Sequence, residues 1–421
     1  MKRVLSLILA LALLLPVLSL AELDEEDFSS DELVEDVDLD EDYEFDEEGN
    51  MVLKDDDSGE AFDLTGVSEE DIEKLASQYE LDDSIDPKEL EINENLPDNI
   101  INILLIGLDV RGTKKEKKLT EQGKYAKRSD VLIILSLNTS DGSIKLSSIA
   151  RNTFVEVPGR KNKTIIANSY GHANYDSNGK YASWTDTPET CIRTVNHNFE
   201  LNIREYVAIN FYGVAQIIEG LGGVDIDLTK TEARAINTYL STGTIRNSKG
   251  EKISHGREIA NSYDDKNGKR TALKKQDGVQ HLDGIQALMY ARLRSIDSDF
   301  VRTARTRHLL DCLLKQTMEK IKSGKLDMFN LISDFIEYPI TNINPARIFE
   351  LAGLVSSSDM MNDLGSASSL ISEFRIPIDG YWKYDTVNGS SVTVMKDQQY
   401  TVESLHEFIY GRYYPTSARA E

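Results

Sequence analysis

The feature that most constrains the fold is a series of three apolar runs that follow one another closely along the chain. Residues 101–108 read INILLIGL, residues 131–137 read VLIILSL and residues 144–150 read IKLSSIA. A short, continuous apolar run bounded by polar residues is typical of a strand that is buried on both faces. The Asp141-Gly142 pair between the second and third runs favours a tight turn. The sequence therefore predicts three neighbouring strands at the centre of a sheet.

Helical and extended patterns alternate in the rest of the chain. We expect helices over residues 187–201, 212–221, from about 299 to 323 and 402–410, and strands over residues 205–211, 224–228, 374–377 and 391–395. The inner side of the third helix should carry Leu309, Leu310, Leu313, Leu314, Met318 and Ile321. Such alternation predicts an α/β fold of the α-β-α type, in which helices cover a central mixed sheet.

The first residues indicate export from the cytoplasm. Lys2 and Arg3 precede an apolar run over residues 4–20, which ends in Ser19-Leu20-Ala21, the small-residue pattern of a signal-peptidase site. The run is also close to the shortest length that spans a membrane, so an uncleaved signal anchor is the alternative. We expect residues 1–21 to be a signal peptide or anchor and the rest of the chain to be extracytoplasmic.

An acidic segment follows. Residues 22–57 contain twenty Asp and Glu and one Lys, in a chain of net charge −25. This composition is typical of a solvated, disordered spacer; a calcium-collecting tail is the alternative, but the spacing of a calcium loop is missing. We expect a spacer over residues 22–98 with a short helix near 68–79, one folded domain over 99–412, and a flexible tail over 413–421.

The two cysteines, Cys191 and Cys312, fall in predicted helices. In an oxidising compartment they can either pair or remain as two separate thiols, and both alternatives stay open. The six histidines form no zinc-binding motif, so the sequence does not point to zinc chemistry.

The stretch over residues 290–307, YARLRSIDSDFVRTARTR, concentrates five arginines in an acidic chain. Arg292 and Arg294 are two apart and share one side of an extended segment, whereas Arg302 and Arg305 share one face of the helix that follows. Ser298 or Asp299 is a plausible N-cap for that helix.

Two interpretations account for this stretch. The first is a salt-bridged surface in which Asp297 and Asp299 neutralise two of the arginines. The second is an anion site, because the planar fork of arginine suits phosphate oxygens and several forks suit a pyrophosphate. We favour the anion site, because arginine is in excess over the carboxylates and because Arg128 and Arg151 lie at the ends of predicted strands.

Asp109 and Asp130 also fall at the ends of predicted strands. A single aspartate in such a place is most often a cap or turn residue. Two of them beside arginines offer the oxygen ligands that Mg²⁺ or Mn²⁺ prefers, and these ions bridge substrate phosphates. The combination indicates phosphoryl transfer by positioning and charge neutralisation.

Five segments together resemble the LytR-CpsA-Psr family in order and spacing. They are NILLIGLD (102–109), RSDVLIILSLN (128–138), SSIARNTFVEVPG (147–159), EYVAINFYGVAQIIEGLGGVDI (205–226) and GVQHLDGIQALMYARLRSIDSDFVRTAR (278–305). The resemblance runs from about Ile101 to Tyr410. It implies a phosphotransferase at the outer leaflet of the membrane, facing the cell wall. Such an enzyme moves a glycopolymer, of the teichoic acid or capsular polysaccharide type, from an undecaprenyl-pyrophosphate carrier onto peptidoglycan. It also implies an apolar tunnel for the polyprenyl chain, and no nucleic-acid partner.

The resemblance further assigns roles to residues. Asp109 and Asp130 look like the family's Mg²⁺ ligands. The residues that look like its pyrophosphate and head-group contacts are Arg128, Arg151, Arg292, Arg294, Arg302 and Arg305. Asp299 is similar to the acidic residue between the arginine pairs, and we take it, with Arg292 and Arg294, as the catalytic set; whether Asp299 is the base is left open.

The sequence departs from the family pattern in three places. Ala150-Arg151-Asn152 stands where the family has Pro-Arg-Asp, Thr306 stands where it has Gln, and the Asn-rich motif is weakened over residues 165–174. Two alternative functions therefore stay beside the transferase. One is a polyprenyl-pyrophosphate hydrolase, which passes the phosphoryl group to water, and the other is a non-catalytic protein that binds the polyprenyl lipid.

Overall fold

The computed structural model describes most of the chain from residue 81 onward. The described ranges are 81–108, 129–141, 143–175, 181–242, 271–291, 338–356, 371–387 and 389–416. Short strands at 43–45, 51–53, 245–246 and 252–253 are also described, as are single residues or short groups at 74, 77, 293, 305 and between 308 and 323.

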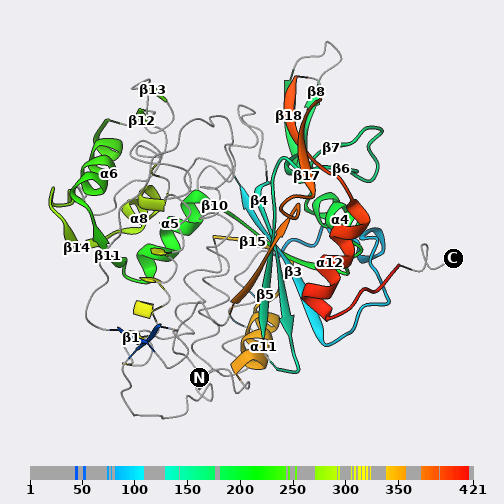
Figure 1. Ribbon diagram of the computed structural model, residues 1–421, viewed down its shortest axis with the longest axis horizontal. Coiled ribbons are helices and arrows are strands. Elements are labelled where there is room, and N and C mark those ends of the chain that lie inside the picture. Colours follow the sequence, from blue (N-terminus) through cyan, green and yellow to red (C-terminus); the bar gives the residue numbers. More distant parts are fainter. Residues whose placement is uncertain are drawn as a thin grey trace.

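A six-stranded mixed sheet forms the centre of the molecule (Figure 1). Its strands lie in the order β15 (Ile340–Thr341), β10 (Glu205–Asn210), β3 (Ile100–Leu108), β4 (Ser129–Asn138), β5 (Ile144–Ile149) and β16 (Ile371–Ile376). The antiparallel neighbours β3, β4 and β5 are the three predicted strands. β10 runs parallel to β3, and β16 runs parallel to β5. The prediction of a central mixed sheet is confirmed.

Helices cover both faces of this sheet (Figure 1). One face carries α4 (Pro188–Phe199) and α12 (Gln398–Tyr410), and the side with α5 (Phe211–Gly220) and α11 (Pro345–Ser356) is the other. Helix α8 (Gly284–Ala291) packs on α5, and α6 (Lys230–Thr242) packs on α8 farther from the sheet. Successive side chains of a strand point to opposite faces. Ile103 and Leu105 of β3 accordingly belong to the apolar core with α5 and α8, whereas Leu104 and Ile106 belong to the core with α4 and α12. The α-β-α arrangement is as predicted.

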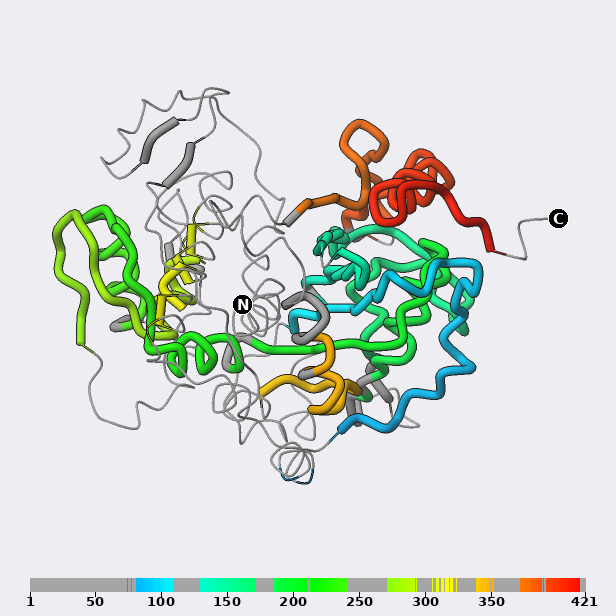
Figure 2. Tube along the Cα trace, turned by 90° about the horizontal axis from the view of Figure 1, so that it is seen from below, coloured from blue at the N-terminus to red at the C-terminus, as the bar shows by residue number. Residues whose placement is uncertain are grey.

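The remaining strands form two-stranded pairs. These are β1 (Tyr43–Phe45) with β2 (Met51–Leu53), β6 (Phe154–Val155) with β7 (Thr164–Ile165), β8 (Gly171–Tyr175) with β9 (Tyr181–Asp186), β11 (Val224–Leu228) with β14 (Gly278–Leu282), β12 (Ile245–Arg246) with β13 (Lys252–Ile253), and β17 (Trp382–Val387) with β18 (Ser390–Met395). Two short 3-10 helices, η2 (Pro87–Glu89) and η4 (Ile166–Asn168), complete the described elements. Figure 2 shows the β11–β14 pair and α6 at the end of the molecule opposite to α12.

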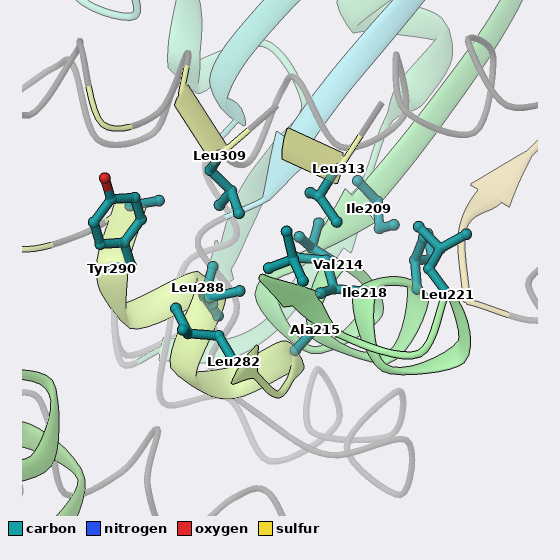
Figure 3. Close-up of a cluster of buried hydrophobic side chains, with 14 of the residues drawn as sticks. Ile209, Val214, Ala215, Ile218, Leu221, Leu282, Leu288, Tyr290, Leu309 and Leu313 are labelled. Carbon is teal, nitrogen blue, oxygen red and sulfur yellow. The ribbon is translucent and has the colours of Figure 1, made fainter. Parts of the chain in front are cut away.

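The helix predicted beyond the arginine stretch is present at Arg305, His308, Leu309, Cys312 and Leu313. Leu309 and Leu313 are buried against α5 and α8, as Figure 3 shows. Four other predicted inner residues, Leu310, Leu314, Met318 and Ile321, lie outside the described residues.

Residues 81–98, which we expected to belong to the spacer, lie against the domain. Leu90 is fully buried, and its carbonyl oxygen accepts a hydrogen bond of 2.8 Å from Asn196 Nδ2 on α4. Asn93 Nδ2 donates to the carbonyl oxygens of Glu200, at 3.1 Å, and Tyr414, at 2.8 Å. The boundary of the folded domain at residue 99 stays a prediction, but this segment contributes to the core.

The two cysteines are not joined by a disulfide. Burial raises the pKa of the Cys191 thiol to about 12, so this thiol is inert at neutral pH. In the part of the chain that the structure describes, no helix is long and apolar enough to cross a membrane. The predicted signal segment, residues 1–21, and most of the acidic spacer lie outside that part.

Candidate functional site

Five strands of the central sheet meet at one edge, which we call the site edge. The carboxyl ends of β3 and β10 lie side by side there, with Leu108 paired to Asn210. The carboxyl ends of β5 and β16 lie next to each other as well, with Ile149 paired to Ile376, and β4 begins between β3 and β5. Ligands of α/β sheets bind at the carboxyl ends of strands. The site edge therefore brings together the strand ends next to which Asp109, Arg128, Asp130 and Arg151 stand in the sequence.

The start of β4 contains a β-bulge. Gly107 pairs with Val131 and Leu108 pairs with Ser129, so Asp130 is the extra residue opposite the last step of β3. A bulge changes the direction in which a side chain points and is frequent beside functional sites. The backbone of Asp130 consequently lies next to Leu108, the residue before Asp109. Asp109, Arg128 and the side chain of Asp130 lie outside the described residues.

Arg151 follows β5 in a turn that is held from several sides. The Ala150 amide donates to the carbonyl oxygen of Ile376 at 2.8 Å, and the Arg151 carbonyl oxygen accepts from the Ala167 amide at 3.1 Å. The carbonyl oxygen of Ala167 in turn accepts a hydrogen bond from Ser129 Oγ, which is buried, at 3.2 Å. Ala167 thus holds the start of β4 and the end of β5 together. Sequence reasoning missed Ser129 and Ala167, although Ala167 lies inside the weakened Asn-rich motif.

Asn152, one of the departures from the family pattern, also lies in this turn. Its carbonyl oxygen accepts a hydrogen bond of 2.9 Å from the Thr393 amide of β18. Thr153 and Thr393 form an isolated β-bridge, so the β17–β18 hairpin is attached beside Arg151. The backbone of the Ala150-Arg151-Asn152 motif is therefore ordered at the site edge.

Only part of the arginine stretch is described. Tyr290 at the end of α8 and Leu293 are buried in the apolar core, and the Leu293 amide donates to the Tyr290 carbonyl oxygen at 3.3 Å. Figure 3 shows the Tyr290 ring beside this core. Arg292, Arg294, Asp299 and Arg302 lie outside the described residues, so their proposed convergence stays a prediction.

Arg305 lies in a buried ion pair. Its Nε donates to Glu232 Oε1 at 2.7 Å, and its Nη1 donates to the Leu293 carbonyl oxygen at 3.1 Å. The exposed fractions of the two charged side chains are 3% for Arg305 and 13% for Glu232. The salt-bridge interpretation named Asp297 and Asp299 as partners, whereas the carboxylate found at Arg305 belongs to α6.

Glu232 is a residue that sequence reasoning missed. It is the third residue after Thr229, and its Oε2 accepts hydrogen bonds from Thr229 N and Thr229 Oγ, both at 2.9 Å. This is the capping box that the TKTE sequence signals. The pKa of the neighbouring Tyr290 hydroxyl is raised, first by burial and then by the negative charge of Glu232.

Two carboxylates at the ends of adjacent strands are the type of donor that a hard cation such as Mg²⁺ prefers, and the strand pairing brings the backbone of Asp130 to the end of β3. The residue types fit such an ion. Within the described ranges, no group of three or more His, Cys, Asp or Glu side chains forms a metal site.

Comparison with known proteins identifies the family. The model of the LytR_cpsA_psr family matches residues 67–404. The polyisoprenyl-teichoic acid–peptidoglycan teichoic acid transferase TagU of Bacillus cereus is 24% identical over 309 residues, which cover 72% of this chain and 77% of TagU. The corresponding TagV of Bacillus subtilis is 26% identical over 232 residues, which cover 54% of this chain and 46% of TagV.

Solved structures of similar proteins include TagV of B. subtilis and TagT bound to LIIa-WTA. TagV has a TM-score of 0.44 and 22% identity, and the match covers 76% of this chain and all of that one (100%). TagT has a TM-score of 0.45 and 16% identity, and the match covers 76% of this chain and 95% of TagT. Because the family model spans most of the chain, including every segment that carried the resemblance, the protein belongs to the LytR_cpsA_psr family.

Proposed function

We propose that this protein is an extracytoplasmic transferase that moves a glycopolymer from an undecaprenyl-pyrophosphate carrier onto peptidoglycan. The observation that carries the proposal is the family match over residues 67–404. Its relatives TagU and TagV are named as transferases that use polyisoprenyl-linked teichoic acid as donor and peptidoglycan as acceptor. The polymer is of the teichoic acid or capsular type.

The transfer is a displacement at phosphorus. A hydroxyl group of peptidoglycan forms a new P–O bond to the phosphate that carries the glycopolymer and loses its proton, while the bond to the polyprenyl phosphate breaks. Arg128, Arg151, Arg292, Arg294 and Arg302 bind the pyrophosphate oxygens and stabilise the charge on the leaving phosphate. Arg151 supports this arrangement because the backbone of its turn is held at the site edge. Asp299 orients a neighbouring arginine or accepts the proton.

Asp109 and Asp130 would hold Mg²⁺ or Mn²⁺, which neutralises phosphate charge when bound. Residues 1–21 bring the domain across the membrane and either leave it secreted or anchor it at the outer leaflet, where both the lipid carrier and peptidoglycan are found. The catalytic domain is expected over residues 99–412, with an apolar tunnel that takes the polyprenyl chain.

Product analysis with the full chain tests this function. The protein is incubated with a labelled teichoic acid precursor on polyprenyl pyrophosphate, with peptidoglycan and with Mg²⁺. We expect label on peptidoglycan together with released polyprenyl phosphate. Free labelled polymer without attachment would instead identify a hydrolase, and bound lipid without turnover would identify a lipid-binding protein.

Two sets of variants test the site in the same assay. Arg292→Ala and Arg294→Ala should each lower the rate about 10²- to 10³-fold, because each removes a charged donor from the transition state, while the melting temperature stays unchanged. Arg234→Ala, which removes an exposed arginine of α6, is the matched control and should keep full activity. A large loss of stability with normal activity per folded molecule would favour the salt-bridge interpretation. Asp130→Ala or a chelator should also abolish turnover.

A further inference from the structure

Arg305 connects two places in the arginine stretch with helix α6: it pairs with Glu232 of α6 and donates to the carbonyl oxygen of Leu293. We propose that Arg305 is a positioning residue and not a pyrophosphate contact: with Glu232 it holds the backbone between Arg292 and Arg294 against helix α6. The role in transfer rests on the proposed function, whereas the structural connection does not.

Arg305 is fixed by two hydrogen bonds in different directions. Nε donates to Glu232 Oε1 at 2.7 Å, and Nη1 donates to the Leu293 carbonyl oxygen at 3.1 Å. The guanidinium group is planar and its donors have a fixed geometry, so two bonds determine its orientation. With an exposed fraction of 3%, the Arg305 side chain is directed into the protein. Its helical spacing from Arg302 had suggested a shared substrate face.

Glu232 is itself held in place by its position in α6. Its Oε2 accepts two hydrogen bonds of 2.9 Å from Thr229, and the Glu232 amide donates to Thr229 Oγ at 3.2 Å. The two carboxylate oxygens therefore have separate roles, since Oε2 caps the helix and Oε1 binds Arg305. The carboxylate is also favoured by the positive end of the helix dipole.

Leu293 is the residue on which the connection acts. Its side chain is buried in the apolar core, its amide donates to Tyr290 O, and its carbonyl oxygen accepts from Arg305 Nη1. Arg292 and Arg294 are its two neighbours in the sequence. The residue between them is therefore held at both its amide and its carbonyl oxygen. Such preorganisation reduces the entropy lost when the two guanidinium groups bind a pyrophosphate.

Hydrogen exchange of the full chain tests the structural connection without any assumption about function. Glu232→Gln keeps the shape of the side chain and can still complete the capping box, but it removes the charge that pairs with Arg305. We expect the Leu293 amide to exchange at least about tenfold faster in this variant. Thr229→Ala, which removes the capping hydroxyl and keeps the ion pair, is the matched control and should exchange as the wild type does. Unchanged exchange in Glu232→Gln would overturn the proposal.

Steady-state transfer separates positioning from direct contact. Glu232→Gln and Arg305→Lys should lower kcat by similar factors, about tenfold, with little change in KM. The double variant should be no worse than either single variant, because both changes break one connection. If Arg305→Lys instead weakens binding of a polyprenyl pyrophosphate in detergent micelles while Glu232→Gln does not, Arg305 touches the substrate and the proposal is wrong. If the wild type transfers nothing, the proposed function fails, and the exchange result still decides the structural connection.

Discussion

Single buried polar side chains join distant parts of the chain, and His406 of α12 is an example. His406 Nε2 lies 3.0 Å from the carbonyl oxygen of Phe199, and Nδ1 accepts from the Tyr414 amide at 3.3 Å. A neutral ring with its proton on Nε2 satisfies both contacts. Burial lowers the pKa of His406, and the nearby Glu200 opposes this shift only in part. The ring therefore binds a proton less readily in the folded protein than in the unfolded chain.

This histidine should make stability depend on pH. In the unfolded chain its pKa is about 6.5, so at mildly acidic pH the unfolded state binds more protons than the folded state. The contribution is fully present above pH ~6.5 and is lost as the pH falls below that value towards the lowered pKa of the folded state, by at most about 1.4 kcal/mol per pH unit. We expect the free energy of unfolding in urea to fall more steeply between pH 7.5 and 5.5 in the wild type than in His406→Gln. Equal slopes would contradict this account.

At the scale of elements, helices α5 and α8 approach each other closely at Gly284. A Cβ atom on Gly284 would lie 1.9 Å from the Ala215 carbonyl oxygen and 2.8 Å from its carbonyl carbon. Both are backbone atoms of α5, so they cannot turn aside as a flexible side chain does. The Gly284 amide also donates to Glu219 Oε2 at 2.8 Å. The contact sets the place of α8, which leads directly into the arginine stretch.

We therefore expect Gly284→Ala to lower the free energy of unfolding by about 3 kcal/mol, at the upper end of the usual cost of overpacking. Gly220→Ala is the control, because Gly220 is exposed in the last turn of α5, where alanine favours the helix by up to about 1 kcal/mol. Urea unfolding of both variants checks the difference. If Gly284→Ala were as stable as Gly220→Ala, α5 and α8 could move apart without loss of folding free energy, and this account would be wrong.

At the scale of the whole molecule, the segment over residues 81–98 packs against the apolar core that α4 and α12 share. Leu90 belongs to that core, and Asn93 joins the segment to Tyr414 near the end of the described chain. Asn95 Nδ2 likewise donates to the carbonyl oxygen of Pro415 at 2.8 Å. The two ends of the described domain are thus bonded to each other.

Two truncated chains should differ in stability for this reason. A chain that begins at Leu81 should unfold at the same temperature as the full chain, because the composition of the acidic segment over residues 22–57 predicts a solvated spacer. A chain that begins at Asn99 loses the burial of Leu90, which contributes about 2 kcal/mol. It also loses the hydrogen bonds that Asn93 donates and the one that Asn196 of α4 donates to Leu90, at about 1 kcal/mol each. Calorimetry of the two chains measures the difference, and equal transitions would show that the segment is not part of the folded unit.

Local patterns were sufficient to predict the centre of the fold. The three apolar runs had to be buried on both faces, and the Asp141-Gly142 turn made the second and third of them neighbours, as the pairing of Leu137 with Ile144 confirms. The strand β17 was missed because its sequence, WKYDTV, is mostly exposed and carries little apolar signal. The family resemblance was also visible in the sequence, because the residue types within each motif and the order of the motifs can be read directly from the chain.

The sequence by itself determined the central strands, the α-β-α class, the family and the set of candidate site residues. Only the tertiary structure decided which residues meet: β16 beside β5, Leu90 beneath α4, Ala167 between Ser129 and Arg151, and Glu232 beside Arg305 across 73 residues of chain. Periodicity assigns a side chain to one face of its own helix or strand. Which distant charge or apolar group that face meets depends on how the elements pack together. For that reason Arg305, which the sequence groups with Arg302, is held inside the protein by Glu232.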